Sequence, residues 1–81
     1  MLISEHQFYM LAERYKLSPT QKVLVRNLLK GVFKDRDMAC AMGIAEGTVH
    51  AQLGRISKKM HIGSRAGILY EFISEAKSIS P

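Results

Sequence analysis

Apolar residues recur at helical spacing along almost the whole chain, and this periodicity is the feature that most constrains the fold. The clearest example is the segment 46–60, whose apolar residues fall on one face of a helix. These residues are Val49, Leu53, Ile56 and Met60. No segment sustains the alternation of apolar and polar residues that a half-buried strand requires. The sequence therefore predicts an all-α fold, a compact helical domain.

Capping and turn residues divide this helical pattern into separate segments. Ser4 followed by Gln7 has the spacing of a capping box, and Ser18 followed by Pro19 is a typical helix start. Gly31 accepts the left-handed backbone conformation that ends many helices. The expected helices cover about 4–15, 18–31, 35–42 with Asp35 as the N-cap, 46–60, and the stretch from 64 onward.

The strongest local signal lies between residues 35 and 54. Two helices that cross steeply need a small residue where they meet, which Ala39 supplies. The turn between them needs a residue that accepts a left-handed conformation, which Gly43 supplies. Val49 then anchors the second helix in the core, so that its far face stays free. The spacing predicts a helix-turn-helix, although two ordinary helices joined by a glycine turn would also produce it.

The apolar stripes also define the expected core. Its members are Leu28, Met38, Val49, Leu53, Ile56 and Phe72. Cys40, between two alanines in the middle of a helix, is expected at a packed or half-packed position. A single cysteine forms no disulfide within one chain and fits a reducing compartment, so we expect a cytoplasmic protein.

Basic residues are concentrated in the middle of the chain. Residues 14–65 hold eleven of the twelve Lys and Arg residues and three acidic residues, whereas residues 1–13 and 66–81 carry net charges of −2 and −1. A basic middle with acidic flanks favours a polyanionic partner. The alternative is a solvated basic surface that only keeps the protein soluble.

Several function classes have no residues to support them. His6, His50 and His61 lack the spacing and the companions of metal ligands, so we expect no metal site. The sequence has no Gly-rich phosphate loop and no evident nucleophile with its base, so we expect neither a cofactor nor an enzyme. No apolar run approaches the roughly 18 residues of a membrane span, and no signal peptide is evident, so we expect no membrane association.

A further set of short motifs lies between residues 17 and 75. They are Leu17-Ser18-Pro19, Leu28-Leu29-Lys30-Gly31, Met38-Ala39, Met42-Gly43-Ile44, Thr48-Val49, Leu53, Ile56, Lys58-Lys59-Met60 and Ser64-Arg65. Together they resemble the LuxR-type (GerE-like) helix-turn-helix domain. The resemblance implies a four-helix domain whose third helix, about 46–60, lies in the major groove of double-stranded DNA. It also implies a bacterial or phage transcription regulator at the nucleoid, often a homodimer held by the last helix.

The resemblance divides the chain into three parts. These are an accessory N-terminal helix at 1–16, the helix-turn-helix domain at 17–77 and a frayed tail at 78–81. Because sixteen residues precede the domain in this sequence, we expect no receiver or ligand-binding domain of the kind that most members carry. Three residues depart from the family pattern: Gln21 replaces a Glu, His61 replaces a helix-ending Gly or Asn, and Ala45 replaces a Ser or Thr cap. The missing cap costs about 1 kcal/mol of helix initiation.

Opposite the core-facing Val49, the helix 46–60 presents small residues with longer side chains at the edges. This face comprises Gly47, Thr48, His50, Ala51, Gly54, Arg55 and Lys58. We interpret it as a surface that reads base edges, with the Ala51 methyl group against a thymine methyl group. The alternative is an inherited helix that no longer reads bases well. Phosphate contacts, or alternatively solvated surface positions, are expected for Lys34, Arg36, Thr48, Lys58, Lys59 and Arg65.

The added N-terminal helix carries more apolar surface than a free arm would. We therefore hypothesise that it joins the last helix in a two-fold homodimer interface, with Phe8, Leu11, Gly67 and Tyr70 as candidate residues. A protein-binding anti-activator or adaptor with the same fold, whose partner is another regulator protein, is the alternative function. A detached output domain of a larger regulator is a third interpretation.

Overall fold

The structure, a computed structural model, describes the backbone of residues 3–79 and the side chains of residues 3–75. Over this range the chain forms helices and no strand, so the all-α prediction is confirmed. The helices are α1 (Glu5–Arg14), α2 (Pro19–Leu29), α3 (Asp35–Met42), α4 (Glu46–Met60) and α5 (Arg65–Ile79). α5 continues through residues 78–79, where the sequence predicts a frayed tail. Residues 80–81, the rest of that tail, lie outside the described range.

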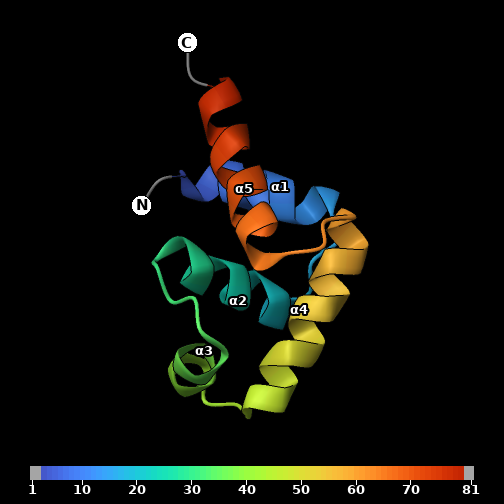
Figure 1. The fold of residues 1–81 in the computed structure, drawn as a ribbon. Coiled ribbons are helices and arrows are strands. Elements are labelled where there is room, and N and C mark those ends of the chain that lie inside the picture. The colour runs from blue at the N-terminus through green and yellow to red at the C-terminus, as the bar shows by residue number, and fades with distance from the viewer. Residues whose placement is uncertain (1–2, 80–81) are drawn as a thin grey trace.

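The helices are arranged around α2, which contacts α3, α4 and α5. Figure 1 shows α1 and α5 together at one end of the molecule, α3 at the other end, and α4 along one side. α1 packs on α5, and α3 packs on both α2 and α4. None of the helices in the described range combines the length and apolar composition that crossing a membrane requires.

α1 and α2 both begin with a capping box; the sequence predicts the box at Ser4 and, for α2, only the Ser18 cap. The backbone N–H of Gln7 donates to Ser4 Oγ at 3.1 Å, and the backbone N–H of Ser4 donates to Gln7 Oε1 at 3.2 Å. Ser18 and Gln21 form the same pair of bonds, at 3.2 and 2.9 Å. Each box provides side-chain acceptors for two backbone N–H groups at a helix start, which stabilises the first turn.

α3 and α4 begin without a side-chain cap. Lys34 is the N-cap of α3, so the expectation that Asp35 has this role is wrong; Asp35 is the first helical residue. Ala45 is the N-cap of α4, with φ −75° and ψ 152°, close to the backbone angles of the two capping serines. Backbone geometry therefore starts α4 where the sequence predicts, without the hydrogen bond that a serine would add.

The turn between α3 and α4 has the backbone that the sequence predicts. Gly43 adopts φ +68° and ψ 35°, a left-handed conformation that is strained for most side chains. α3, this turn and α4 are thus connected as in a helix-turn-helix. His61 ends α4 in the same left-handed region, with φ +58°. Both positions agree with the sequence-based expectation.

The core is continuous through all five helices. The six residues expected there, Leu28, Met38, Val49, Leu53, Ile56 and Phe72, are all buried. Phe8 of α1 and Phe72 of α5 lie with their ring centroids 5.4 Å apart, a geometry typical of favourable aromatic pairs. The same core therefore extends from α4 to the N-terminal helix.

α1 belongs to this core and is not a separate arm. Phe8 and Leu11 are 0% and 1% exposed within a single chain. Side chains that have no accessible surface cannot form an interface with a second copy, so their assignment to a dimer contact is wrong. The apolar stripe of α1 is instead covered by α5 and α2 of the same molecule, as the contacts of α1 with Phe72 and with Arg26 show.

Cys40 is exposed, so the expectation of a packed or half-packed position is wrong. The buried residues of α3 are Met38 and Ala39. One residue further along, a helix has turned by about 100°, which carries Cys40 away from the core. Its small neighbours therefore do not mark a packed site.

Candidate nucleic-acid interface

α4 presents one buried and one exposed face, and the exposed face carries the residues that the sequence singles out. Val49, Leu53, Ile56 and Met60 are buried against the other helices. Gly47, Thr48, His50, Ala51, Gly54, Arg55 and Lys58 are all exposed. The face is therefore accessible to a partner along the whole length of α4.

The glycines of this face are not required by packing within the molecule. A Cβ atom added at Gly47 or Gly54 would meet no heavy atom within 4 Å. Glycine inside a helix costs about 1 kcal/mol relative to alanine, so Gly54 lowers the stability of α4 without relieving any internal crowding. Its effect is to flatten the exposed surface between His50 and Lys58.

Lys34 and Arg36 lie at the start of α3, the helix that packs on α4. Both residues are exposed, and neither forms an ion pair with the described residues. Arg55 and Lys58 on α4 are also unpaired over that range. Of the acidic residues nearby in sequence, Asp35 pairs with Arg65, whereas Asp37 and Glu46 are exposed and form no ion pair with the described residues.

Arg65 is not free in the way that the sequence suggests. Its guanidinium forms an ion pair with Asp35 at 2.6 Å and donates to the backbone oxygen of Phe33 at 2.5 Å. The same group lies 5.7 Å from the centre of the Phe33 ring. Arg65 therefore ties the first residue of α5 to the loop before α3. In this structure its charge is used internally, and its expected phosphate contact would require these bonds to be shared or broken.

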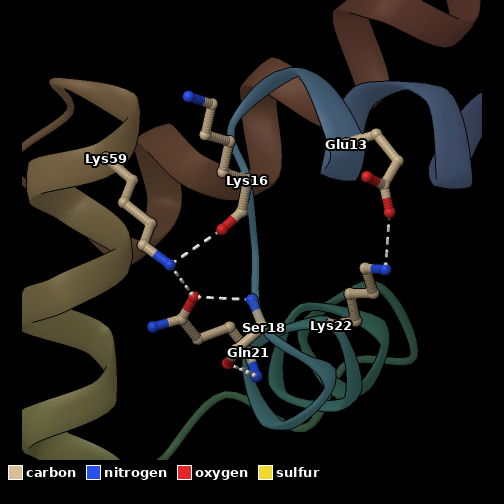
Figure 2. A network of polar contacts seen from close by, with 6 residues as sticks. All are labelled: Glu13, Lys16, Ser18, Gln21, Lys22 and Lys59. Atoms are coloured by element: carbon tan, nitrogen blue, oxygen red, sulfur yellow. Dashed lines mark hydrogen bonds and ion pairs between the residues drawn. The ribbon is translucent and has the colours of Figure 1, made fainter.

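Lys59 is also engaged, but by neutral oxygens. Its Nζ donates to Gln21 Oε1 at 2.7 Å and to the backbone oxygen of Lys16 at 2.8 Å (Figure 2). Gln21 is only 3% exposed, and its Nε2 donates to Gln52 Oε1 at 3.1 Å. Sequence reasoning missed this network, because it noted Gln21 only as a departure from the Glu of the family pattern and Lys59 only as a phosphate contact or a solvated surface residue.

Ion pairs gather on the other side of the molecule. Arg14–Glu75, Lys22–Glu13 and Arg26–Glu5 connect α1 with α5 and α2, at 3.3, 2.9 and 2.5 Å. The hydrogen bond from Arg26 lowers the pKa of Glu5, and the hydrogen bond from Lys22 lowers the pKa of Glu13. These cations are neutralised by carboxylates of the same chain, whereas Arg55 and Lys58 of α4 have no such partner within residues 3–75.

Two residues of α5 were expected in a dimer interface, and the structure places them differently. Tyr70 is 71% exposed, the most exposed of the large apolar side chains. Gly67 is half-buried, and a Cβ atom there would lie 2.5 Å from Ile62 Cγ2 of the same chain. Close packing on Ile62 accounts for the glycine, so Tyr70 is the one candidate of the four with a large free surface.

No pocket is found in the structure, and no cluster of His, Cys, Asp and Glu side chains suited to a metal ion occurs among the described residues. Comparison of the chain with known protein families, with curated proteins and with solved structures finds no match. The geometry and charge of α3 and α4 are therefore what bears on function.

Proposed function

We propose that the protein is a sequence-specific DNA-binding transcription regulator that inserts α4 into the major groove. The observation that carries the proposal is the exposed face of α4, whose cations Arg55 and Lys58 have no carboxylate partner among the described residues. A major groove admits one α-helix, and cations along its edges bind phosphates. The motif resemblance to LuxR-type domains supports the same arrangement.

In this proposal the stretch of α4 from His50 to Arg55 reads bases. His50 and Arg55 supply hydrogen-bonding groups, and Ala51 supplies a methyl group for contact with thymine. The absence of a side chain at Gly54 lets the helix backbone approach the base edges closely. Discrimination between sequences then depends on few contacts, each worth about 1–3 kcal/mol.

Phosphate contacts position the helix. We assign the phosphate contacts to Lys58 at the C-terminal end of α4 and to Lys34 and Arg36 at the start of α3, which are exposed cations. Thr48 and the uncapped amides at the start of α4 add neutral donors to phosphate. These groups fix orientation without reading sequence, so their removal weakens all DNA about equally.

A homodimer remains part of the proposal, with a smaller set of contacts. Tyr70 on α5, with Tyr9 and Met10 on α1, supplies the exposed apolar surface, since these side chains are 71%, 54% and 57% exposed. Two copies joined there would place two α4 helices on one duplex, as half-site recognition requires. The protein would act in the cytoplasm, on the nucleoid.

The same exposed apolar residues favour one alternative, a protein-binding anti-activator or adaptor. Aromatic and methionine side chains are enriched at protein interfaces, and here the exposed ones belong to α1 and α5 and not to α4. The alternative predicts binding of another regulator through Tyr9, Met10 or Tyr70, together with little affinity for DNA.

The experiment that tests the proposal compares two substitutions that introduce the same charge. Duplexes enriched by the wild-type protein from a randomised library, and random duplexes, are titrated by fluorescence anisotropy. Ala51→Glu should reduce affinity for the enriched duplexes by about 10- to 100-fold, through a lost contact and repulsion of the groove. Ala66→Glu, at an exposed position of α5, should have little effect.

Circular dichroism must show that both variants keep their helical content. Wild-type protein that enriches no sequence and binds random duplexes without salt dependence would refute the proposal. Equal losses in Ala51→Glu and Ala66→Glu would refute the placement of α4 in the groove.

A further inference from the structure

The contact between the α1–α2 turn and the C-terminal end of α4 is built around a buried amide. Gln21 Oε1 accepts two hydrogen bonds, from the backbone N–H of Ser18 at 2.9 Å and from Lys59 Nζ at 2.7 Å. Its Nε2 donates to Gln52 Oε1. Figure 2 shows the Lys59 side chain reaching from α4 to this amide and to the backbone oxygen of Lys16. Both polar atoms of the Gln21 side chain are therefore hydrogen-bonded, and the backbone N–H of Gln21 donates to Ser18 Oγ.

The Lys16 backbone supplies a second acceptor for Lys59. Lys16 adopts φ +56°, an uncommon left-handed conformation for a residue with a side chain. Its carbonyl oxygen lies 2.8 Å from Lys59 Nζ. An exposed lysine normally samples many rotamers, so two short hydrogen bonds to ordered oxygens confine this ammonium to one place.

The ammonium is held without being neutralised. Both acceptors are neutral oxygens, and Lys59 forms no ion pair with any described residue. A lysine ammonium has three N–H donors, of which these bonds use two. One donor and the full positive charge remain available at the exposed C-terminal end of α4.

The neighbouring lysine of α2 shows the contrast. Lys22 Nζ lies 2.9 Å from the Glu13 carboxylate, so its charge is compensated within the chain (Figure 2). A carboxylate at position 21 would have the same effect on Lys59. Glutamine preserves the acceptor oxygen and the capping box while contributing no charge.

We propose that Gln21 is a positioning residue that holds Lys59 as a fixed, uncompensated cation for a DNA phosphate. This inference rests on the proposed function, because the phosphate is that of the strand beside the C-terminal end of α4. The neutral Gln21 amide strengthens the contact between Lys59 and the phosphate in two ways. It orders the ammonium, which lowers the entropy lost on binding, and it does not neutralise the positive charge that attracts the phosphate.

Gln21→Glu tests the proposal, because it keeps the acceptor for Lys59 and Ser18 and adds a neutralising charge. The Gln52 amide can rotate to donate to the new carboxylate, so the contact between the α1–α2 turn and α4 should be kept. We expect unchanged or higher thermal stability but weaker binding of enriched and random duplexes. The slope of log affinity against log salt should fall in magnitude by about 0.9. Raising the salt from about 50 to about 200 mM should therefore weaken binding by the variant about 3.5-fold less than it weakens binding by the wild type.

The chain supplies a matched control in its other capping box. Gln7 has the same relation to Ser4 that Gln21 has to Ser18, but no lysine of the described residues bonds to its side chain. Gln7→Glu makes the same change in net charge at the same position of a helix, so it should leave the salt slope at the wild-type value.

Lys59→Met provides the second arm, since it keeps the aliphatic stem and removes the charge. It should lower the salt slope by about 0.9, and adding Gln21→Glu to it should lower the slope little further. If the wild-type protein binds DNA with salt dependence but Gln21→Glu and Lys59→Met both keep its salt slope, the role of Gln21 and Lys59 is overturned. The proposed function would stand in that case. A wild-type protein without salt-dependent DNA binding would overturn the proposed function and this inference together.

Discussion

The starts of α1 and α2 differ from those of α3 and α4 in how they are stabilised. Ser4 and Ser18 cap their helices through complete capping boxes, whereas Lys34 and Ala45 begin theirs with no side-chain hydrogen bond. The charges divide in the same way. Cations of α1 and α2 are paired with carboxylates, and the cations of α3 and α4 other than Lys59 have no polar side-chain contact among the described residues.

The difference indicates that local stabilisation is concentrated on one side of the molecule. α1, α2 and α5 are held by caps, ion pairs and the Phe8–Phe72 contact. α3 and α4 depend on burial of their apolar faces and on a few long-range contacts, such as Arg65 with Asp35. Polar groups that no internal contact uses are available to a ligand, which is why the less stabilised side is the one proposed to bind DNA.

The largest expected effect tests whether α1 belongs to the stabilising side. Phe8→Ala should lower the free energy of unfolding by about 3–5 kcal/mol, because a fully buried ring and its packing are lost. A domain of this length has roughly 4–12 kcal/mol in total, so the whole fold should weaken. Urea denaturation followed by circular dichroism measures the change.

Met10→Ala, at a 57% exposed position of the same helix, is the control and should change stability by less than about 0.5 kcal/mol. If Phe8→Ala were as mild as Met10→Ala, α1 would be a dispensable arm, and the comparison between the two sides would lose its basis.

The next effect concerns the missing cap of α4. Ala45 already has the backbone angles of a capping residue, so Ala45→Ser needs only to add its hydroxyl, which can accept from the backbone N–H of Thr48. We expect a gain of about 1 kcal/mol in the free energy of unfolding. Ser18→Ala, which removes the equivalent group from α2, should lose a similar amount. Thermal unfolding of the two variants therefore should move in opposite directions from wild type.

Much of this fold follows from local sequence rules. Spacing of apolar residues predicts the helices, and Ser4, Ser18 and Gly43 mark ends that the structure confirms. Those features depend on neighbours within about four residues, which sequence displays directly.

The surroundings of each face are less predictable. The stripe containing Phe8 and Leu11 must be buried, but periodicity does not say whether the same chain or a second copy covers it. Lys59 and Arg65 meet partners 38 and 32 residues away in sequence. Such contacts arise only when the core has fixed how the helices pack. Sequence reasoning therefore treated Lys59 and Arg65 as free cations, whereas in the structure both form hydrogen bonds within the chain.

A smaller effect compares cations from the two sides. Lys58→Ala should lower the magnitude of the salt slope of DNA binding by about 0.9, because an unpaired cation is available to phosphate. Arg14→Ala removes the same charge from an ion pair with Glu75 at the α1–α5 contact and should leave the slope unchanged. Anisotropy titrations at several salt concentrations measure both. Equal slopes for the two variants would show that internal pairing does not decide which cations bind DNA.

The smallest expected effect is the acid sensitivity of the paired side. Hydrogen bonds from Arg26 and Lys22 hold the pKa values of Glu5 and Glu13 below their ordinary value of 4.5. Because these pKa values are depressed in the folded state, the stabilisation is present above about pH 4.5 and is lost as the pH falls through the lower folded values. The carboxylates are exposed, so solvent screening keeps the contribution small.

The variant Glu5→Gln/Glu13→Gln should therefore have a slightly lower melting temperature than wild type at about pH 6 and the same melting temperature at about pH 3. In about 1 M salt the difference at the higher pH should shrink, because the ion pairs are screened. A constant difference across the whole pH range would mean that the substitutions act through packing or helix propensity. The ion pairs would then contribute nothing to the stability of α1 on α2, and the capping boxes and the aromatic core alone would distinguish the two sides.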